Sequence, residues 1–147
     1  MSAGNRAVWF DKNYRDAVYV DVRCEVKPSI IADSRALPAS IGGEFDLIVF
    51  DPPHVNFGPN ANKSKDYGHH TTEEIRDILR GSAKEAHRVS RQDALMALKW
   101  NDHDQKLERV LDILGPWWEP LFGHKVSTRT KHYCSTQWVM LRRRSND

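Results

Sequence analysis

The stretch FDLIVFDPPH, residues 45–54, constrains the fold more than any other part of the chain. Residues 47–50 are apolar on both faces, a pattern typical of a strand in a sheet that helices cover on both sides. The apolar run stops at Asp51, and two prolines follow. Each proline fixes φ and lacks a backbone N–H. The sequence therefore predicts a core strand that ends in a stiff, polar loop.

The rest of the chain alternates strand-like and helix-like patterns. Thr71 and Glu74 have capping-box spacing, and an apolar stripe follows them. Expected strands lie at 17–23, 29–38, 45–53, 93–100, 119–127 and 136–143, and expected helices at about 71–89 and 107–114. A polar loop without helical periodicity separates the last two strands, which favours antiparallel pairing. The alternation predicts one α/β domain over residues 1–147, a doubly wound sandwich with a mostly parallel sheet.

Composition limits the class of protein. A chain of 147 residues supports one core, and 22 basic against 20 acidic residues make it only mildly cationic. A nucleic-acid-binding surface would therefore need local clustering of charge. Cys24 and Cys134 have no repeated spacing and are expected to be free thiols. No signal peptide and no apolar run of about 20 residues is present, so we expect a cytoplasmic protein that does not contact a membrane.

Acidic residues end three consecutive predicted strands: Asp21, Asp33 and Asp51. In open parallel sheets, ligands bind beyond the carboxyl ends of the strands. Any one of these acids could simply cap the turn that follows it, as aspartate often does. The three together at one edge of the sheet favour a binding site.

The residue types at 51–54 suit one kind of ligand. A carboxylate beside a fixed backbone carbonyl can accept both protons of a planar NH₂ group and leave its lone pair available for attack. The flat side chain of His54 could stack on the ring that carries the amine. The alternative is a Pro-Pro turn with a surface histidine, which the core strand aimed at the ligand-binding edge makes less attractive.

The sequence Asp-Pro-Pro-His resembles the (D/N/S)PP(aromatic) motif of S-adenosylmethionine-dependent methyltransferases that act on exocyclic amino groups of DNA, the N6-adenine and N4-cytosine enzymes. The stretches WFDKNYRDAVYVDVR, FDLIVFDPPH, YG, KWN and PLFGHK resemble small phage-type enzymes of this class, over about residues 4–141. The resemblance implies a Rossmann-like methyltransferase sandwich with an antiparallel C-terminal strand pair. It departs from the family at His54, where the family has an aromatic residue.

The resemblance also implies roles for particular residues. Asp21 would accept hydrogen bonds from the ribose hydroxyls of S-adenosylmethionine. The other implied cofactor contacts are the cofactor adenine with Asp33, Ser34 and Leu37, and its methionine end with the loop that contains Gly4 and Asn5. The catalytic residues would be Asp51, Pro52, Pro53 and His54. Only residues 1–3 precede Gly4, so the first strand of the fold is expected to be shortened or missing, to be replaced by residues 6–11, or to be supplied by a homodimer or another partner chain.

The expected reaction is methyl transfer to a base amine, adenine N6 in DNA being favoured. The base must leave the helix stack or be unpaired to reach such a site. An RNA amino-methyltransferase is an alternative with the same chemistry. A catalytically inactive nucleic-acid-binding module is the other alternative; the short N-terminus favours it, and the intact Asp51-Pro52-Pro53 sequence opposes it.

Further residues are candidates for substrate binding: Lys99, Trp100, Asn101, His124 and Lys125. Packing of Trp100 and helix capping by Asn101 are equally good explanations of those two residues. The spacing of His69, His70, His124, His132 and Cys134 does not match a closed zinc site, so no metal is expected. The loop over about 55–70 is the one candidate for reading base sequence, and loose sequence preference is expected.

Overall fold

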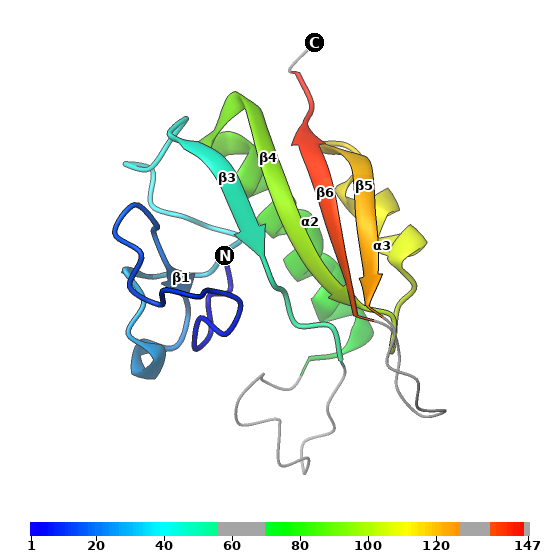
Figure 1. Cartoon of the computed structure of the whole chain (residues 1–147), viewed down its shortest axis with the longest axis horizontal. Helices are drawn as coiled ribbons and strands as arrows, with labels where there is room; N and C mark the ends of the chain where they lie inside the picture. The colour runs from blue at the N-terminus through cyan, green and yellow to red at the C-terminus, as the bar shows by residue number, and fades with distance from the viewer. Residues whose placement is uncertain (56–69, 127–135, 146–147) are drawn as a thin grey trace.

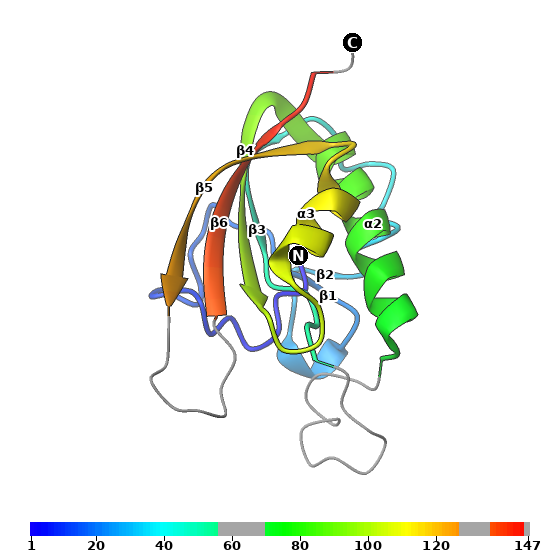
Figure 2. The ribbon, with the colours of Figure 1, turned by 90° about the vertical axis from the view of Figure 1, so that its right-hand side faces the viewer.

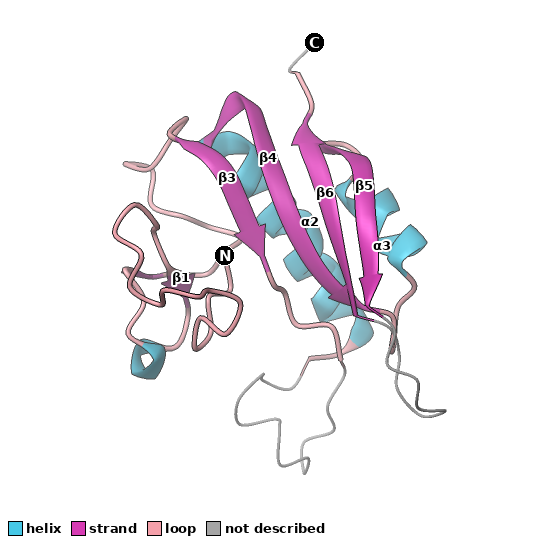
Figure 3. Cartoon of the chain, in the orientation of Figure 1, coloured by secondary structure: helices cyan, strands magenta, loops and turns pink. Residues whose placement is uncertain are grey.

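The computed structural model describes residues 1–55, 70–126 and 136–145, with the side chains of 125 and 126 outside that description. Strands and helices alternate as the sequence predicts (Figures 1 and 3). Their order is β1 (Val20–Asp21), the 3₁₀ helix η1 (Cys24–Val26), β2 (Ile30–Ile31), β3 (Phe45–Phe50), α2 (Thr72–Val89), β4 (Ser90–Asn101), α3 (Leu107–Leu114), β5 (Trp118–Val126) and β6 (Thr136–Arg143).

The larger sheet has the strand order β3-β4-β6-β5. Strands β3 and β4 are parallel, whereas β6 is antiparallel to both of its neighbours. Three strands therefore point in one direction and β6 in the other, as the arrowheads in Figure 1 show. The predicted mostly parallel strand orientation and the antiparallel pairing of the last two strands are both confirmed.

The strands predicted at 17–23 and 29–38 are much shorter than expected. In their place are β1 and β2, two residues each, which pair in parallel and form a separate small sheet. An aspartate side chain forms a turn at or just after the end of each strand. Asp21 Oδ1 accepts the Arg23 N–H at 3.0 Å, and Asp33 Oδ1 accepts the Arg35 N–H at 2.8 Å. Each aspartate thus closes a local turn with the backbone two residues further on, and the strand cannot continue.

The first residues of the chain lie between the two sheets. The amino group of Met1 donates to the Val49 carbonyl of β3 at 2.7 Å. The Ala3 N–H donates to the Val20 carbonyl of β1 at 2.9 Å. Backbone hydrogen bonds therefore connect residues 1–3 to the small sheet on one side and to the large sheet on the other.

The core lies between the large sheet and one helical layer. Helices α2 and α3 cover the same face of the sheet (Figure 2). Ile48 and Phe50 are buried on that face, while Leu47 on the other face is 50% exposed. The prediction of helices on both faces is therefore wrong for the described part of the chain. No helix in the described ranges is both long enough and apolar enough to cross a membrane.

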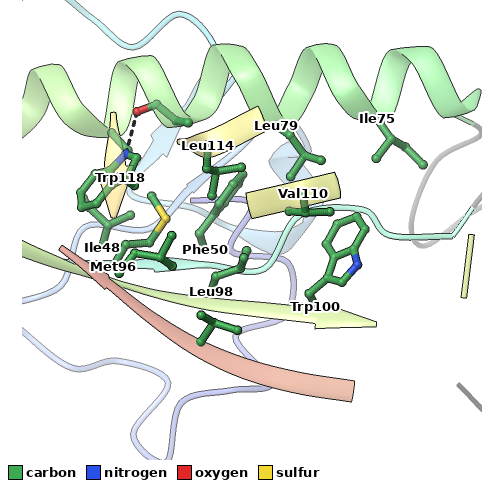
Figure 4. Packing of buried hydrophobic residues seen from close by; sticks show 14 of the residues in the cluster. Ile48, Phe50, Ile75, Leu79, Met96, Leu98, Trp100, Val110, Leu114 and Trp118 are labelled. Atoms are coloured by element: carbon green, nitrogen blue, oxygen red, sulfur yellow. Dashed lines mark hydrogen bonds between the residues drawn. The ribbon is translucent and has the colours of Figure 1, made fainter. Parts of the chain in front are cut away.

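Two indole rings anchor the helical layer, and both are fully buried (Figure 4). Trp118 Nε1 donates to the Ala83 carbonyl of α2 at 3.0 Å, and Trp100 Nε1 donates to the Gln105 carbonyl at 2.9 Å. At the start of α2, Thr71 and Glu74 form the predicted capping box. The two indole N–H groups thus have partners in the core, and the capping box satisfies N–H groups at the exposed start of α2.

We expect Phe50→Ala to lower the free energy of unfolding by about 3–5 kcal/mol, because it leaves a cavity at a fully buried position of β3. The matched control is Leu47→Ala on the exposed face of the same strand, with an expected loss of about 1 kcal/mol or less. Urea denaturation followed by circular dichroism measures both. Equal losses for the two variants would contradict the one-sided core.

Candidate functional site

A cavity of about 1550 Å³ opens between the two sheets, at the carboxyl ends of β1, β2 and β3. Its walls include every predicted cofactor residue and all four residues of the Asp-Pro-Pro-His loop. These are Gly4, Asn5, Asp21, Asp33, Ser34, Leu37, Asp51, Pro52, Pro53 and His54. Segments that are far apart in the sequence therefore border one hollow, as expected at the carboxyl edge of an α/β sheet.

The lip of the cavity, defined as residues 51–54, begins where β3 ends. Phe50 lies opposite Leu98 in the parallel register of β3 and β4, which places the next residues, Asp51 and Lys99, side by side. Lys99 Nζ donates to Asp51 Oδ2 at 2.9 Å, and both side chains are 27% exposed. The acid predicted to bind an amine thus already binds the ammonium group of a lysine.

The carbonyl of the lip is engaged as well. His54 Nδ1 lies 3.2 Å from the carbonyl oxygen of Pro52, and the imidazole meets the edge of Trp100 at a centroid distance of 6.1 Å. Burial lowers the pKa of His54 below 6.5, although the Pro52 carbonyl and Asp51 act in the opposite direction. The ring is therefore neutral at pH 7. A carbonyl only accepts hydrogen bonds, so Nδ1 carries the proton.

Asp21 organises the opposite wall. Its Oδ2 accepts the Gly4 N–H at 2.8 Å, and its Oδ1 accepts from the backbone and the guanidinium of Arg23. Burial on its own would raise the pKa of Asp21, but the hydrogen bonds from Arg23 and Gly4 outweigh it and hold the pKa below 3.8. Gly4 has φ +50°, a conformation that favours glycine, so the loop over Asp21 depends on this residue.

The three residues predicted to contact the cofactor adenine, in the loop after β2, have distinct environments. Arg35 forms a 2.6 Å ion pair with Asp33, and this pairing is the main reason that the pKa of Asp33 lies below 3.8. Ser34 is buried and shares a 2.6 Å hydrogen bond with Ser82 of α2. The Leu37 N–H donates to the carboxylate of Glu85 at 2.9 Å. These bonds fix the loop to α2 while Asp33 stays at the cavity wall.

Tyr19 is a cavity residue that the sequence analysis missed. Its side chain is buried, and its hydroxyl has no hydrogen-bond partner in the described part of the chain. The guanidinium of Arg6 lies 4.0 Å above its ring. Tyr19 precedes Asp21 by two residues, and side chains at that spacing share a face of a strand. That spacing was the available signal, although the hydroxyl itself is buried and not open to the cavity.

The predicted substrate residues are not all at the cavity. Lys99 and Asn101 line it, but Trp100 is fully buried in the core, so the structure assigns its side chain to packing. Asn101 donates to Thr136 Oγ1 at 3.0 Å and accepts from the His103 N–H. His124 is exposed on β5 and is not part of the cavity wall. Lys125 pairs with Gln137 in the β5–β6 ladder, and its side chain is outside the description.

The remaining histidine predictions concern a metal site. Among the described residues, no group of three His, Cys, Asp or Glu side chains is placed to hold a metal ion. His69, His132 and Cys134 lie outside the described residues, as do residues 56–69 of the loop over about 55–70 that was the candidate for reading base sequence.

Comparison with known proteins identifies the fold. No protein-family model matches the sequence, and no curated protein does. Solved structures match: the PH0226 protein of Pyrococcus horikoshii OT3 is 12% identical, with a TM-score of 0.67 over 97% of this chain and 79% of that one. The N-methyltransferase NodS of Bradyrhizobium japonicum WM9, in complex with S-adenosyl-L-homocysteine, is 13% identical with a TM-score of 0.54 over 86% and 65%.

A third match is TTHA0409 of Thermus thermophilus, described as a candidate DNA modification methylase. It is 14% identical, with a TM-score of 0.50 over 79% of this chain. The chain spans about half the length of that protein, 53%. At such low identities these likenesses establish the fold alone: this chain has the α/β fold found in S-adenosylmethionine-dependent methyltransferases.

We expect Asp21→Asn to flatten the acid end of the stability profile. Because the folded-state pKa of Asp21 lies below 3.8, its ionised form adds stability above that value, and this stability is lost as pH falls through the folded-state pKa. The variant should be less stable at pH 7 by roughly 1–3 kcal/mol and should lose less stability between about pH 5 and 2. Urea denaturation at several pH values measures this. Asp112→Asn, at an exposed position, is the control and should keep the wild-type profile.

Proposed function

We propose that this chain is an S-adenosylmethionine-dependent methyltransferase that acts on an exocyclic amino group of a nucleic-acid base, adenine N6 in DNA being favoured. One observation carries the proposal. The Asp51 carboxylate and the Pro52 carbonyl stand at the end of a core strand and border the same cavity as Asp21 and Gly4. An amine held at the lip would therefore share a hollow with a ligand held along the opposite wall.

The wall opposite the lip offers groups that suit S-adenosylmethionine. Asp21 lies in the cavity wall, and carboxylates of this kind accept hydrogen bonds from ribose hydroxyls in nucleotide-binding folds. In the proposal, Asp33, Ser34 and Leu37 contact the cofactor adenine, and Gly4 and Asn5 its methionine end. When bound, this cofactor supplies an electrophilic methyl group on a positively charged sulfur.

The residues of the lip would bind the amine and hold it in position. Asp51 and the Pro52 carbonyl accept the two N–H bonds of the amine, Pro53 keeps the loop stiff, and His54 stacks on the base. The amine nitrogen would bond to the methyl carbon as the bond from that carbon to sulfur breaks, and it would lose one proton, which the Asp51 carboxylate can accept. A carboxylate at this place also opposes the positive charge that develops on nitrogen. Holding the amine in position is the main contribution that the protein makes.

The favoured partner is DNA, and RNA is the alternative with the same chemistry. The likeness to TTHA0409 supports DNA, and competition between DNA and RNA substrates distinguishes the two. In the proposal the protein acts in the cytoplasm, and a second copy or another chain adds a strand between the two sheets. The hydrogen bonds of Met1 to Val49 and of Ala3 to Val20 already occupy part of that position.

A catalytically inactive nucleic-acid-binding module is the second candidate. It is favoured by the finding that both acceptors of the lip already have donors within the chain, Lys99 and His54. Such a module would bind nucleic acid and transfer no methyl group.

We expect Asp51→Ala to reduce methyl transfer by about 10²–10³-fold, because it removes the charged acceptor for the amine. The control is Asp93→Ala, which removes an exposed carboxylate near the start of β4 and should keep wild-type activity. Mass spectrometry of nucleosides after incubation with labelled cofactor reports the base, the modified atom and the activity together. Full activity of Asp51→Ala would refute the proposed role of the lip, whereas wild-type protein without activity would favour the binding module.

Cofactor binding gives a separate test that does not depend on the nucleic acid. Isothermal titration calorimetry should detect S-adenosylmethionine binding to the wild-type protein. Asp21→Ala should bind it more weakly, by about tenfold, because a charged hydrogen-bond acceptor is lost. The absence of binding at millimolar cofactor would contradict the enzyme proposal.

A further inference from the structure

The lip has two acceptors for an amine, and a donor from the chain occupies each of them. Lys99 Nζ binds Asp51 Oδ2 at 2.9 Å, and His54 Nδ1 lies 3.2 Å from the Pro52 carbonyl oxygen. An exocyclic amino group offers two N–H donors in one plane and would use the same carboxylate and the same carbonyl. The chain thus imitates the substrate with its own side chains, and an incoming amine competes with them.

His54 and Lys99 differ in the charge that has to move when an amine takes their place. Neutral His54 can turn its ring and leave no charge behind. Lys99 carries a positive charge, and its ammonium beside the amine would oppose the positive charge that develops on nitrogen during methyl transfer. For the proposed reaction, this ammonium has to move away from Asp51 while staying paired, because a partly buried charge without a partner is costly.

The described part of the chain offers few other partners to the displaced ammonium. Arg23 pairs with Asp21, and Arg35 with Asp33. Beyond the end of β4, Asp102 accepts from the Leu107 N–H and from Gln137, and Asp104 pairs with His103. The carboxylates at this edge therefore have partners of their own. A phosphate group that arrives with the substrate is an anion without one.

We propose that a phosphate next to the target base opens the lip by drawing Lys99 away from Asp51, so that the site selects an amine on a polynucleotide over the same amine on a free nucleoside. The inference rests on the proposed function and specifies its substrate class. A lysine suits this role because its flexible stem moves a compact charge over several ångströms, and lysine binds phosphate well as a point charge. A free nucleoside brings the amine without the anion and competes poorly with Lys99.

Lys99→Met separates this role from simple support of Asp51. It keeps an unbranched side chain at position 99 and removes the charge. Binding is measured by fluorescence anisotropy for a single-stranded DNA of about ten nucleotides that contains adenine and cytosine, with S-adenosyl-L-homocysteine present and at several salt concentrations. Single-stranded DNA avoids the cost of base flipping. Lys84→Met, at an exposed position of α2 that is not part of the cavity wall, is the matched control.

We expect Lys99→Met to reduce the slope of log K against log salt by about 0.7, the value for one phosphate contact with a single strand. Its affinity for free deoxyadenosine or deoxycytidine, measured by calorimetry, should rise about tenfold because an internal competitor for Asp51 is gone. Lys84→Met should leave both quantities unchanged. Circular dichroism checks that each variant is folded.

His54→Phe is a second, independent variant. It keeps a flat ring and removes the Nδ1 donor from the Pro52 carbonyl. Nucleoside affinity should rise while the salt slope stays at the wild-type value, since no charge is lost.

The outcomes separate this inference from the proposed function. If the wild-type protein methylates DNA but Lys99→Met keeps the wild-type salt slope, or binds nucleosides more weakly, the inference fails and Lys99 only supports Asp51. If the wild-type protein neither binds the oligonucleotide nor transfers a methyl group, the proposed function and the inference both fail. A reduced slope together with tighter nucleoside binding in Lys99→Met supports the inference.

Discussion

The parallel register between β3 and β4 is the constraint on which the rest of the structure depends. Phe50 lies opposite Leu98, and both side chains are buried under α2 and α3. A shift by one residue would turn the apolar side chains of one strand away from the core, so the register is strongly fixed. The same register places Asp51 beside Lys99 at the end of the two strands. Core packing therefore decides the charge pair at the lip.

The cavity depends on how strands end as much as on how they pair. Asp21 ends β1 by accepting the Arg23 N–H, and it also holds the Gly4 loop over the cavity. One carboxylate thus stops a strand, shapes a wall and remains ionised in a buried place. Residues 1–3 connect the small sheet to β3 and keep this wall opposite the lip. The hydrogen bonds that Asp21 accepts therefore both end β1 and form part of the cavity wall.

Much of the fold was predictable because strong periodicity acts locally. The capping box at Thr71, the apolar stripe of α3 and the last two strands match the expected positions closely. The apolar run at 47–50 was misread as buried on both faces, although one face is partly exposed. The burial of Trp100 could have been foreseen, since Met96 and Leu98 share its face at period two. The strands at 17–23 and 29–38 were overestimated because aspartate turns ended them early.

The sequence by itself determined the order of the elements, the stiff Asp-Pro-Pro turn and the acids that follow three strands, because these features depend on residues close together in the chain. Only the tertiary structure decided that Lys99, 48 residues from Asp51, neutralises it, and that the hydroxyl of Tyr19 faces no partner among the described residues. No local pattern encodes such contacts. They arise from strand register and from the approach of two sheets, which long-range packing sets.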